Sequence, residues 1–73
     1  LRVAFHESAE RALQSLEAAA DEAGWRAAAW RLKGLAASFG AVRLMALASE
    51  AAERPAGDPA MLRRLRRAME RLA

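Results

Sequence analysis

The sequence predicts an all-α fold, an antiparallel up-down-up-down four-helix bundle, on three observations. Apolar residues recur at steps of three and four, which is the spacing of one helix face. The apolar fraction is 55%, much of it alanine, and this composition favours helices over sheets. Short turn segments separate the periodic stretches, and short connections make consecutive helices antiparallel neighbours. With 73 residues, the chain is expected to form a single domain, 1-73, around a thin core.

The first two helices are predicted on either side of a polar break. The first covers about residues 1–20, and the second runs from residue 22 or 24 to Phe39. Asp21 can accept a hydrogen bond from the free amides of the second helix, and Gly40 can supply the positive φ that commonly ends a helix. The expected core residues are Leu1, Phe5, Ala9, Ala12, Leu16 and Ala19 in the first helix and Trp25, Ala28, Ala29, Leu32, Leu35, Ala36 and Phe39 in the second.

The third and fourth helices are predicted around a proline-containing turn. The third follows Gly40 and continues to about Arg54, where Pro55 prevents further helix. The fourth begins at Pro59, because Asp58 followed by proline is a typical helix start. The expected core residues are Val42, Met45, Leu47, Ala48, Ala51 and Ala52 in the third helix and Leu62, Leu65, Met69 and Leu72 in the fourth.

Composition narrows the classes of function. There are no cysteines, so we expect neither disulfides nor thiolate metal sites, and a reducing, cytoplasmic location. No stretch approaches the roughly 18 apolar residues of a membrane span, and no signal peptide is evident. The net charge of +3 is modest. We therefore expect no membrane partner, no nucleic-acid partner and no cofactor, and the basic run of the fourth helix is interpreted as a solvated face.

The second helix carries the most informative residue, Trp30. On a helical wheel it lies about 160° from the centre of the core stripe, so a tryptophan is predicted on the solvent side. Gly34, one turn later, weakens the helix and is typical of a place where something must approach the backbone closely. A large aromatic among small residues with a positive rim is typical of a protein interface. The candidate partner-binding residues are Trp30, Lys33, Gly34, Ala27, Ala37, Arg26 and Ser38.

The run Ala28-Ala29-Trp30-Arg31-Leu32-Lys33-Gly34, followed by Ser38-Phe39-Gly40-Ala41, resembles the signature of histidine-phosphotransfer (HPt) domains of two-component phosphorelays. That family's pattern is His-x-Leu-Lys-Gly, a five-residue gap and Gly-Ala, with the histidine exposed in the middle of a helical bundle. The resemblance implies a four-helix bundle whose partners are the receiver domain of a response regulator or a hybrid sensor kinase. It also implies that Lys33 supplies positive charge and that Gly34 permits close approach.

The sequence departs from this pattern at the position that performs the chemistry. Phosphotransfer needs an imidazole nitrogen with a free lone pair, whereas the indole nitrogen of Trp30 is a donor only. We therefore expect no catalytic residue and no enzyme activity, although restored activity with histidine at position 30 is conceivable. His6 is the only histidine. It is interpreted as an ordinary, partly exposed side chain. Glu7, Glu10 and Glu17 have helical spacing but no second type of metal ligand near them, so no metal site is expected.

Three functions stay open at this point. The first is a degenerate HPt-like module that docks a receiver or kinase domain without accepting phosphate. The second is a phosphotransfer domain whose active histidine has been replaced in this variant. The third is a structural bundle in which Trp30 forms the centre of a homodimer or covers an N-terminal helix absent from this sequence. Nucleic-acid binding through the fourth helix is a distant alternative.

Overall fold

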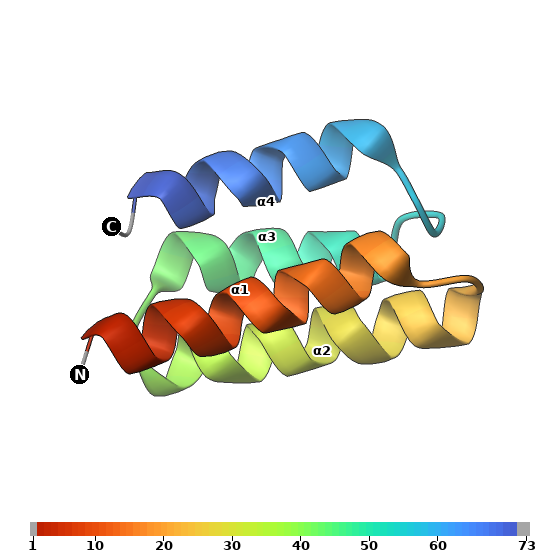
Figure 1. Ribbon diagram of the computed structural model, residues 1–73. Coiled ribbons are helices and arrows are strands. Elements are labelled where there is room, and N and C mark those ends of the chain that lie inside the picture. The colour runs from red at the N-terminus through yellow and green to blue at the C-terminus, as the bar shows by residue number, and fades with distance from the viewer. Residues whose placement is uncertain (1, 72–73) are drawn as a thin grey trace.

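The computed structural model describes residues 2–71, which form four helices connected by short loops. They are α1 (Arg2–Ala18), α2 (Glu22–Ser38), α3 (Val42–Ala52) and α4 (Pro59–Arg71). Figure 1 shows that each helix runs antiparallel to the one before it, and that both chain ends lie at the same end of the bundle. Contacts between α1 and α2, α2 and α3, α3 and α4, and α4 and α1 close the ring. The predicted all-α, up-down-up-down four-helix bundle is confirmed.

The helix ends follow the local chemistry of the turns. The Asp21 side chain accepts a hydrogen bond from the Gly24 amide at 2.8 Å, and the Asp58 side chain accepts one from the Ala60 amide at 3.1 Å. Each carboxylate satisfies an amide that has no partner within its helix. Gly40, with φ of 70°, turns the chain from α2 into α3. The first and third helices end two residues before the predicted limits.

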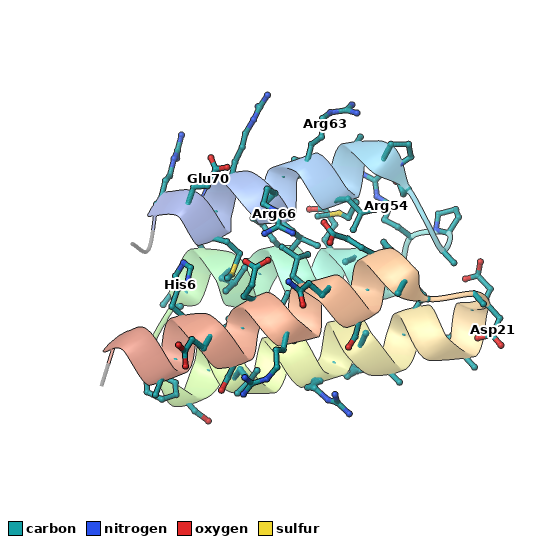
Figure 2. The ribbon with its side chains drawn as sticks, in the orientation of Figure 1. His6, Asp21, Arg54, Arg63, Arg66 and Glu70 are labelled. Atoms are coloured by element: carbon teal, nitrogen blue, oxygen red, sulfur yellow. The ribbon has the colours of Figure 1, made fainter. Side chains whose placement is uncertain are left out.

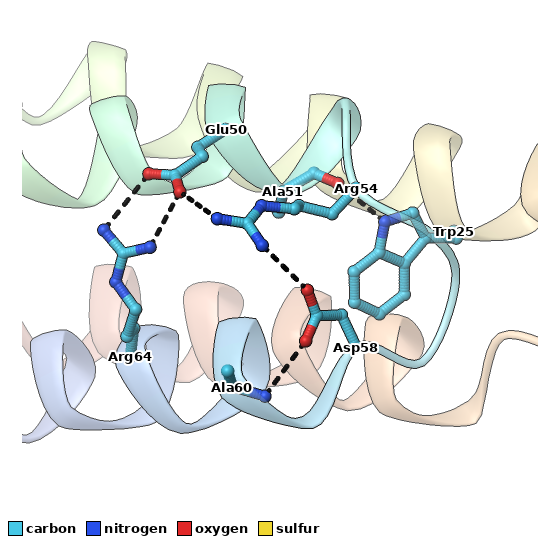
Figure 3. A network of polar contacts seen from close by, with 7 residues as sticks. All are labelled: Trp25, Glu50, Ala51, Arg54, Asp58, Ala60 and Arg64. Carbon is cyan, nitrogen blue, oxygen red and sulfur yellow. Dashed lines mark hydrogen bonds and ion pairs between the residues drawn. The ribbon is translucent and has the colours of Figure 1, made fainter.

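Trp25 is the largest side chain among the fully buried residues of the core. Its ring nitrogen donates a hydrogen bond of 2.7 Å to the carbonyl oxygen of Ala51, in the last turn of α3 (Figure 3). A buried indole N–H needs such a partner, and here the partner ties α2 to α3. The buried core comprises Phe5, Ala9, Ala12, Leu13, Leu16, Trp25, Ala28, Ala29, Leu32, Ala36, Leu44, Leu47, Ala48, Ala51, Met61, Leu65, Ala68 and Met69.

Two residues assigned to the core by sequence periodicity are exposed instead. Phe39 is 57% exposed and Val42 is 68% exposed. Phe39 is the C-cap of α2, so its backbone has left the helix and its side chain has left the phase of the core stripe. Its ring packs at the edge of the bundle, with its centroid 4.5 Å from that of Phe5. Val42 begins α3, where a side chain leans back beyond the end of the bundle.

The predicted core stripes of α3 and α4 are confirmed at Leu47, Ala48, Ala51, Leu65 and Met69, and they differ from the structure near the start of each helix. In α4 Met61 is buried and Leu62 is only partly buried, and in α3 Leu44 is buried and Met45 partly buried. Repeats of three and four leave the phase of a short helix uncertain by one residue, and packing against neighbouring helices settles it. Leu13 and Ala68 are buried although neither was predicted. Ala19, Leu35 and Ala52 are partly buried. Leu1 and Leu72 lie outside the described residues.

Ion pairs connect α4 to both of its neighbours. Arg66 reaches from α4 to α1, where it donates to Glu10 at 2.6 Å and to Glu17 at 2.9 Å; Figure 2 shows its side chain lying between these helices. The hydrogen bond from Arg66 is the main reason that the pKa of Glu10 lies below its ordinary value. The same contacts raise the pKa of Arg66. The pairs hold the seam between the first and last helices.

A second set of ion pairs joins α3 to α4 and to the turn before it (Figure 3). Arg64 donates two hydrogen bonds to the Glu50 carboxylate, at 2.7 and 3.1 Å. Arg54 bridges Glu50 at 3.0 Å and Asp58 at 3.3 Å. The hydrogen bonds from Arg64, and then those from Arg54, lower the pKa of Glu50. Contact with Glu50 raises the pKa of Arg64.

We expect Trp25→Phe to lower the free energy of unfolding by roughly 2 to 3 kcal/mol. The substitution removes the hydrogen bond to Ala51 and leaves unfilled space in a fully buried site. Urea unfolding followed by circular dichroism measures the loss. Trp30→Phe is the matched control, because its ring is half exposed and its replacement should change stability little. Equal losses in the two variants would show that Trp25 is not the main anchor of the bundle.

We expect stability to decline as the pH falls below the ordinary glutamate pKa of 4.5. The folded-state pKa values of Glu10 and Glu50 are lowered, so the unfolded chain binds more protons in the acid range. The stabilisation by these pairs is complete above the unfolded-state pKa and is lost as pH falls through the folded-state values. Urea unfolding at several pH values measures this dependence. In a Glu10→Gln, Glu50→Gln double variant the dependence should be smaller, and an unchanged slope would argue against both pairs.

Candidate functional site

The exposed face of α2 carries the candidate site. Trp30 is 51% exposed, whereas Trp25, five residues earlier on the same helix, is fully buried. Five residues turn a helix by about 500°, which is 140° beyond one full turn. The two indoles of α2 therefore point in different directions, Trp25 into the core and Trp30 toward solvent. The prediction that Trp30 lies on the solvent side is confirmed. A half-exposed tryptophan offers a large, rigid apolar surface that water covers in the free protein.

Lys33 lies directly beside this ring. Its Nζ atom is 4.4 Å from the centroid of the Trp30 indole, within the range of a cation–π interaction. The Lys33 side chain is only partly exposed, with its ammonium group over the ring. An exposed pair of this kind contributes about 0.5 to 1 kcal/mol, enough to bias the rotamers of both side chains. The structure therefore joins two of the predicted site residues into one unit with an apolar surface and a positive charge.

Gly34 provides the open space next to this unit. A Cβ atom added at position 34 would meet no other atom within 4 Å, and the glycine has an ordinary helical conformation. Neither packing nor backbone geometry within the described residues calls for a glycine here. The backbone of α2 is accessible at this point, so a partner can approach it more closely than it could approach any other residue type.

The remaining predicted residues share exposure on α2 and have no described polar contact with one another. Arg26 and Ala27 lie one turn before Trp30, and Ala37 and Ser38 lie two turns after it, at the end of the helix. Because alanine and serine are short, the indole projects above its surroundings along this side of the helix. The face is therefore a raised aromatic side chain on a low, weakly basic surface.

The side chains of this face can recognise a partner. The indole nitrogen of Trp30 can donate a hydrogen bond but has no lone pair for nucleophilic attack. His6 is on α1, near its N-terminal end, and is partly buried (Figure 2). Within residues 2–71 there is no cluster of three or more histidine, cysteine or acidic side chains suited to a metal ion. No helix in the described part of the chain has both the length and the apolarity to cross a membrane.

Sequence reasoning missed two further exposed apolar side chains, Phe39 and Val42, at the connection between α2 and α3. Both flank Gly40, whose positive φ interrupts the helical phase. A change of backbone direction at a glycine was therefore the signal that periodicity should not be extended across it.

Comparison with protein families gives one match that spans the chain. The model of the family described as Hpt domain matches residues 1–73. No curated protein and no solved structure matches the chain.

Proposed function

The chain belongs to the Hpt domain family, the signalling modules of phosphorelays, and on that premise we propose that it docks a receiver or kinase domain without accepting phosphate. Hpt domains interact with receiver domains of response regulators and with kinases in these relays. The proposed docking face consists of Trp30, Lys33 and Gly34, with Arg26, Ala27, Ala37 and Ser38 around them.

The observation that carries the proposal is the half-exposed indole of Trp30. The resemblance of the sequence assigns this residue to the position of the family's phosphorylated histidine. A buried tryptophan at that position would only fill space. An exposed one has a ring available to a partner surface, and tryptophans at the centre of interfaces commonly contribute much of the binding energy. The indole cannot attack a phosphoryl group, so the same observation supports binding without transfer.

The positive charge beside Trp30 and the open backbone at Gly34 both support this docking face. The Lys33 ammonium lies 4.4 Å from the indole centroid and would meet the acidic pocket that the resemblance assigns to a receiver domain. Arg26 is exposed one turn earlier and adds positive charge. Beside them Gly34 leaves the backbone open. The partner that fits this arrangement presents carboxylates next to an apolar patch.

A second candidate function is a relay scaffold that lacks only its nucleophile. The resemblance assigns Lys33 and Gly34 to the family's pattern, and a Cβ added at position 34 would meet no neighbouring side chain within 4 Å. A histidine at position 30 would then lie on an accessible face next to a positive charge. A homodimer centred on Trp30 is the competing structural role, and a molecular mass that rises with protein concentration would support it.

We expect Trp30→Ala and Gly34→Arg each to weaken binding to a receiver domain by at least about ten-fold. The first removes the apolar anchor, and the second places a long side chain where the partner must approach. Isothermal titration calorimetry against a panel of receiver domains measures the change. Ser15→Arg is the control for Gly34→Arg, because it adds the same charge on an exposed position of α1. Unchanged binding by both site variants would eliminate this face.

We expect the chain with Trp30 to take no label from phosphorylated receiver domains, and Trp30→His to acquire it. The imidazole would supply the nucleophilic nitrogen that the indole lacks. Transfer of ³²P followed on denaturing gels distinguishes the two proteins. Label on neither would point to a bundle that shares only the fold. Label on both would redirect attention to His6, and His6→Gln in the chain with Trp30 would then test that residue.

A further inference from the structure

A second basic surface lies away from the α2 face, on α3 and α4. Two arginines of α4, Arg64 and Arg66, are held by glutamates of neighbouring helices. Arg67 and Arg71 of α4 and Arg43 of α3 form no ion pair among the described residues, and all three are exposed. The bundle therefore has cationic side chains whose charge is not compensated within the part of the chain that the structure describes.

These side chains surround one small groove between the two helices. Arg43 contributes from α3, and Arg64, Arg67 and Arg71 contribute from α4, with Ala68 between them. The cavity measures about 110 Å³. The three arginines of α4 are spaced three and four residues apart, so they project from the same side of the helix. No acidic residue lines the groove. Four arginines therefore line a groove without an acidic lining residue, and only Arg64 among them is paired, with Glu50.

Glu50 positions one end of this cluster. Its carboxylate holds the Arg64 guanidinium by two hydrogen bonds of 2.7 and 3.1 Å and also binds Arg54 (Figure 3). Arg64 is thereby restricted in its rotamers and stays at the groove. Arg67 and Arg71 follow along the helix without such restraint, so they can close on a ligand. The cost of holding like charges near one another is relieved when an anion binds between them.

We propose that Arg43, Arg64, Arg67 and Arg71 bind a short chain of linked phosphate groups. Guanidinium groups match phosphate oxygens with paired hydrogen bonds, and arginine is the residue most suited to this contact. The distance along α4 from Arg64 to Arg71 is about 10 Å at 1.5 Å per residue, which suits two or three linked phosphates. No aromatic side chain lines the groove, so none there could stack on a nucleoside base. The ligand is thus recognised by its phosphates, whether free tripolyphosphate or the tail of a nucleoside triphosphate.

The test is to titrate the folded chain with sodium tripolyphosphate at low ionic strength. Calorimetry and the NMR signals of the arginine Nε–H groups measure the binding. We expect one saturable site, with the largest shifts at the four groove arginines. Arg67→Gln, Arg71→Gln as a double variant should bind roughly ten-fold more weakly, since two charge-assisted contacts are lost. Arg43→Gln should weaken binding from the α3 side. Circular dichroism verifies that each variant remains folded.

Arg63→Gln is the matched control, because it removes one exposed charge from the same helix but lines a different groove, between α1 and α4. Arg63→Gln should reduce the affinity for tripolyphosphate much less than Arg43→Gln does. Equal losses would mean a diffuse electrostatic attraction and would overturn the site. ATP should bind about as tightly as tripolyphosphate, and adenosine should not compete. Tighter binding of a single-stranded RNA oligonucleotide, with Arg63 contributing and a steep salt dependence, would assign the surface to a nucleic-acid backbone instead.

Discussion

The hydrogen bond from the Trp25 indole to the Ala51 carbonyl is the constraint on which the arrangement of this bundle depends. Most of the core is alanine and leucine, which pack well but allow helices to slide or rotate with little loss of contact. A buried donor has only one acceptor within reach, so it fixes the level of α2 against α3. It also fixes the rotation of α2 about its own axis. The exposure of Trp30 follows from the burial of Trp25, because both are on one rigid helix.

The two seams beside α4 are held by polar contacts as much as by apolar ones. On the α1 side Arg66 binds two glutamates above a partly buried Leu62. On the α3 side Arg64 binds Glu50. Ion pairs at a surface contribute little to stability, so their main effect is to select one alignment of the helices among several of similar apolar burial. Arg67 and Arg71 of α4 form no ion pair among the described residues, and they line the groove together with Arg43 and Arg64.

Much of the fold could be predicted from sequence because its signals are local. Asp21, Gly40 and the Asp58-Pro59 pair determine helix ends by hydrogen bonds and backbone angles within a few residues. The phase of each core stripe depends on packing between helices, which explains the error at Leu62, whereas those at Phe39 and Val42 come from extending the periodicity across Gly40. The solvent side of α2 could be predicted from the wheel, but the contact between Lys33 and the Trp30 ring depends on rotamers. The arginine groove was missed because Arg43 joins the cluster only when α3 and α4 are adjacent.

The open space beside Gly34 affects which substitutions the chain can accept at this position. Folding gains nothing from a glycine there, and a helix would be more stable with alanine by about 1 kcal/mol. Sequence drift constrained by folding alone would therefore replace it readily, since an added Cβ meets no neighbouring side chain within 4 Å. At position 34, stability of the helix therefore favours alanine, whereas access of a partner to the backbone favours glycine. Stabilising the scaffold for laboratory use by filling it would come at the expense of the surface that the neighbouring indole presents.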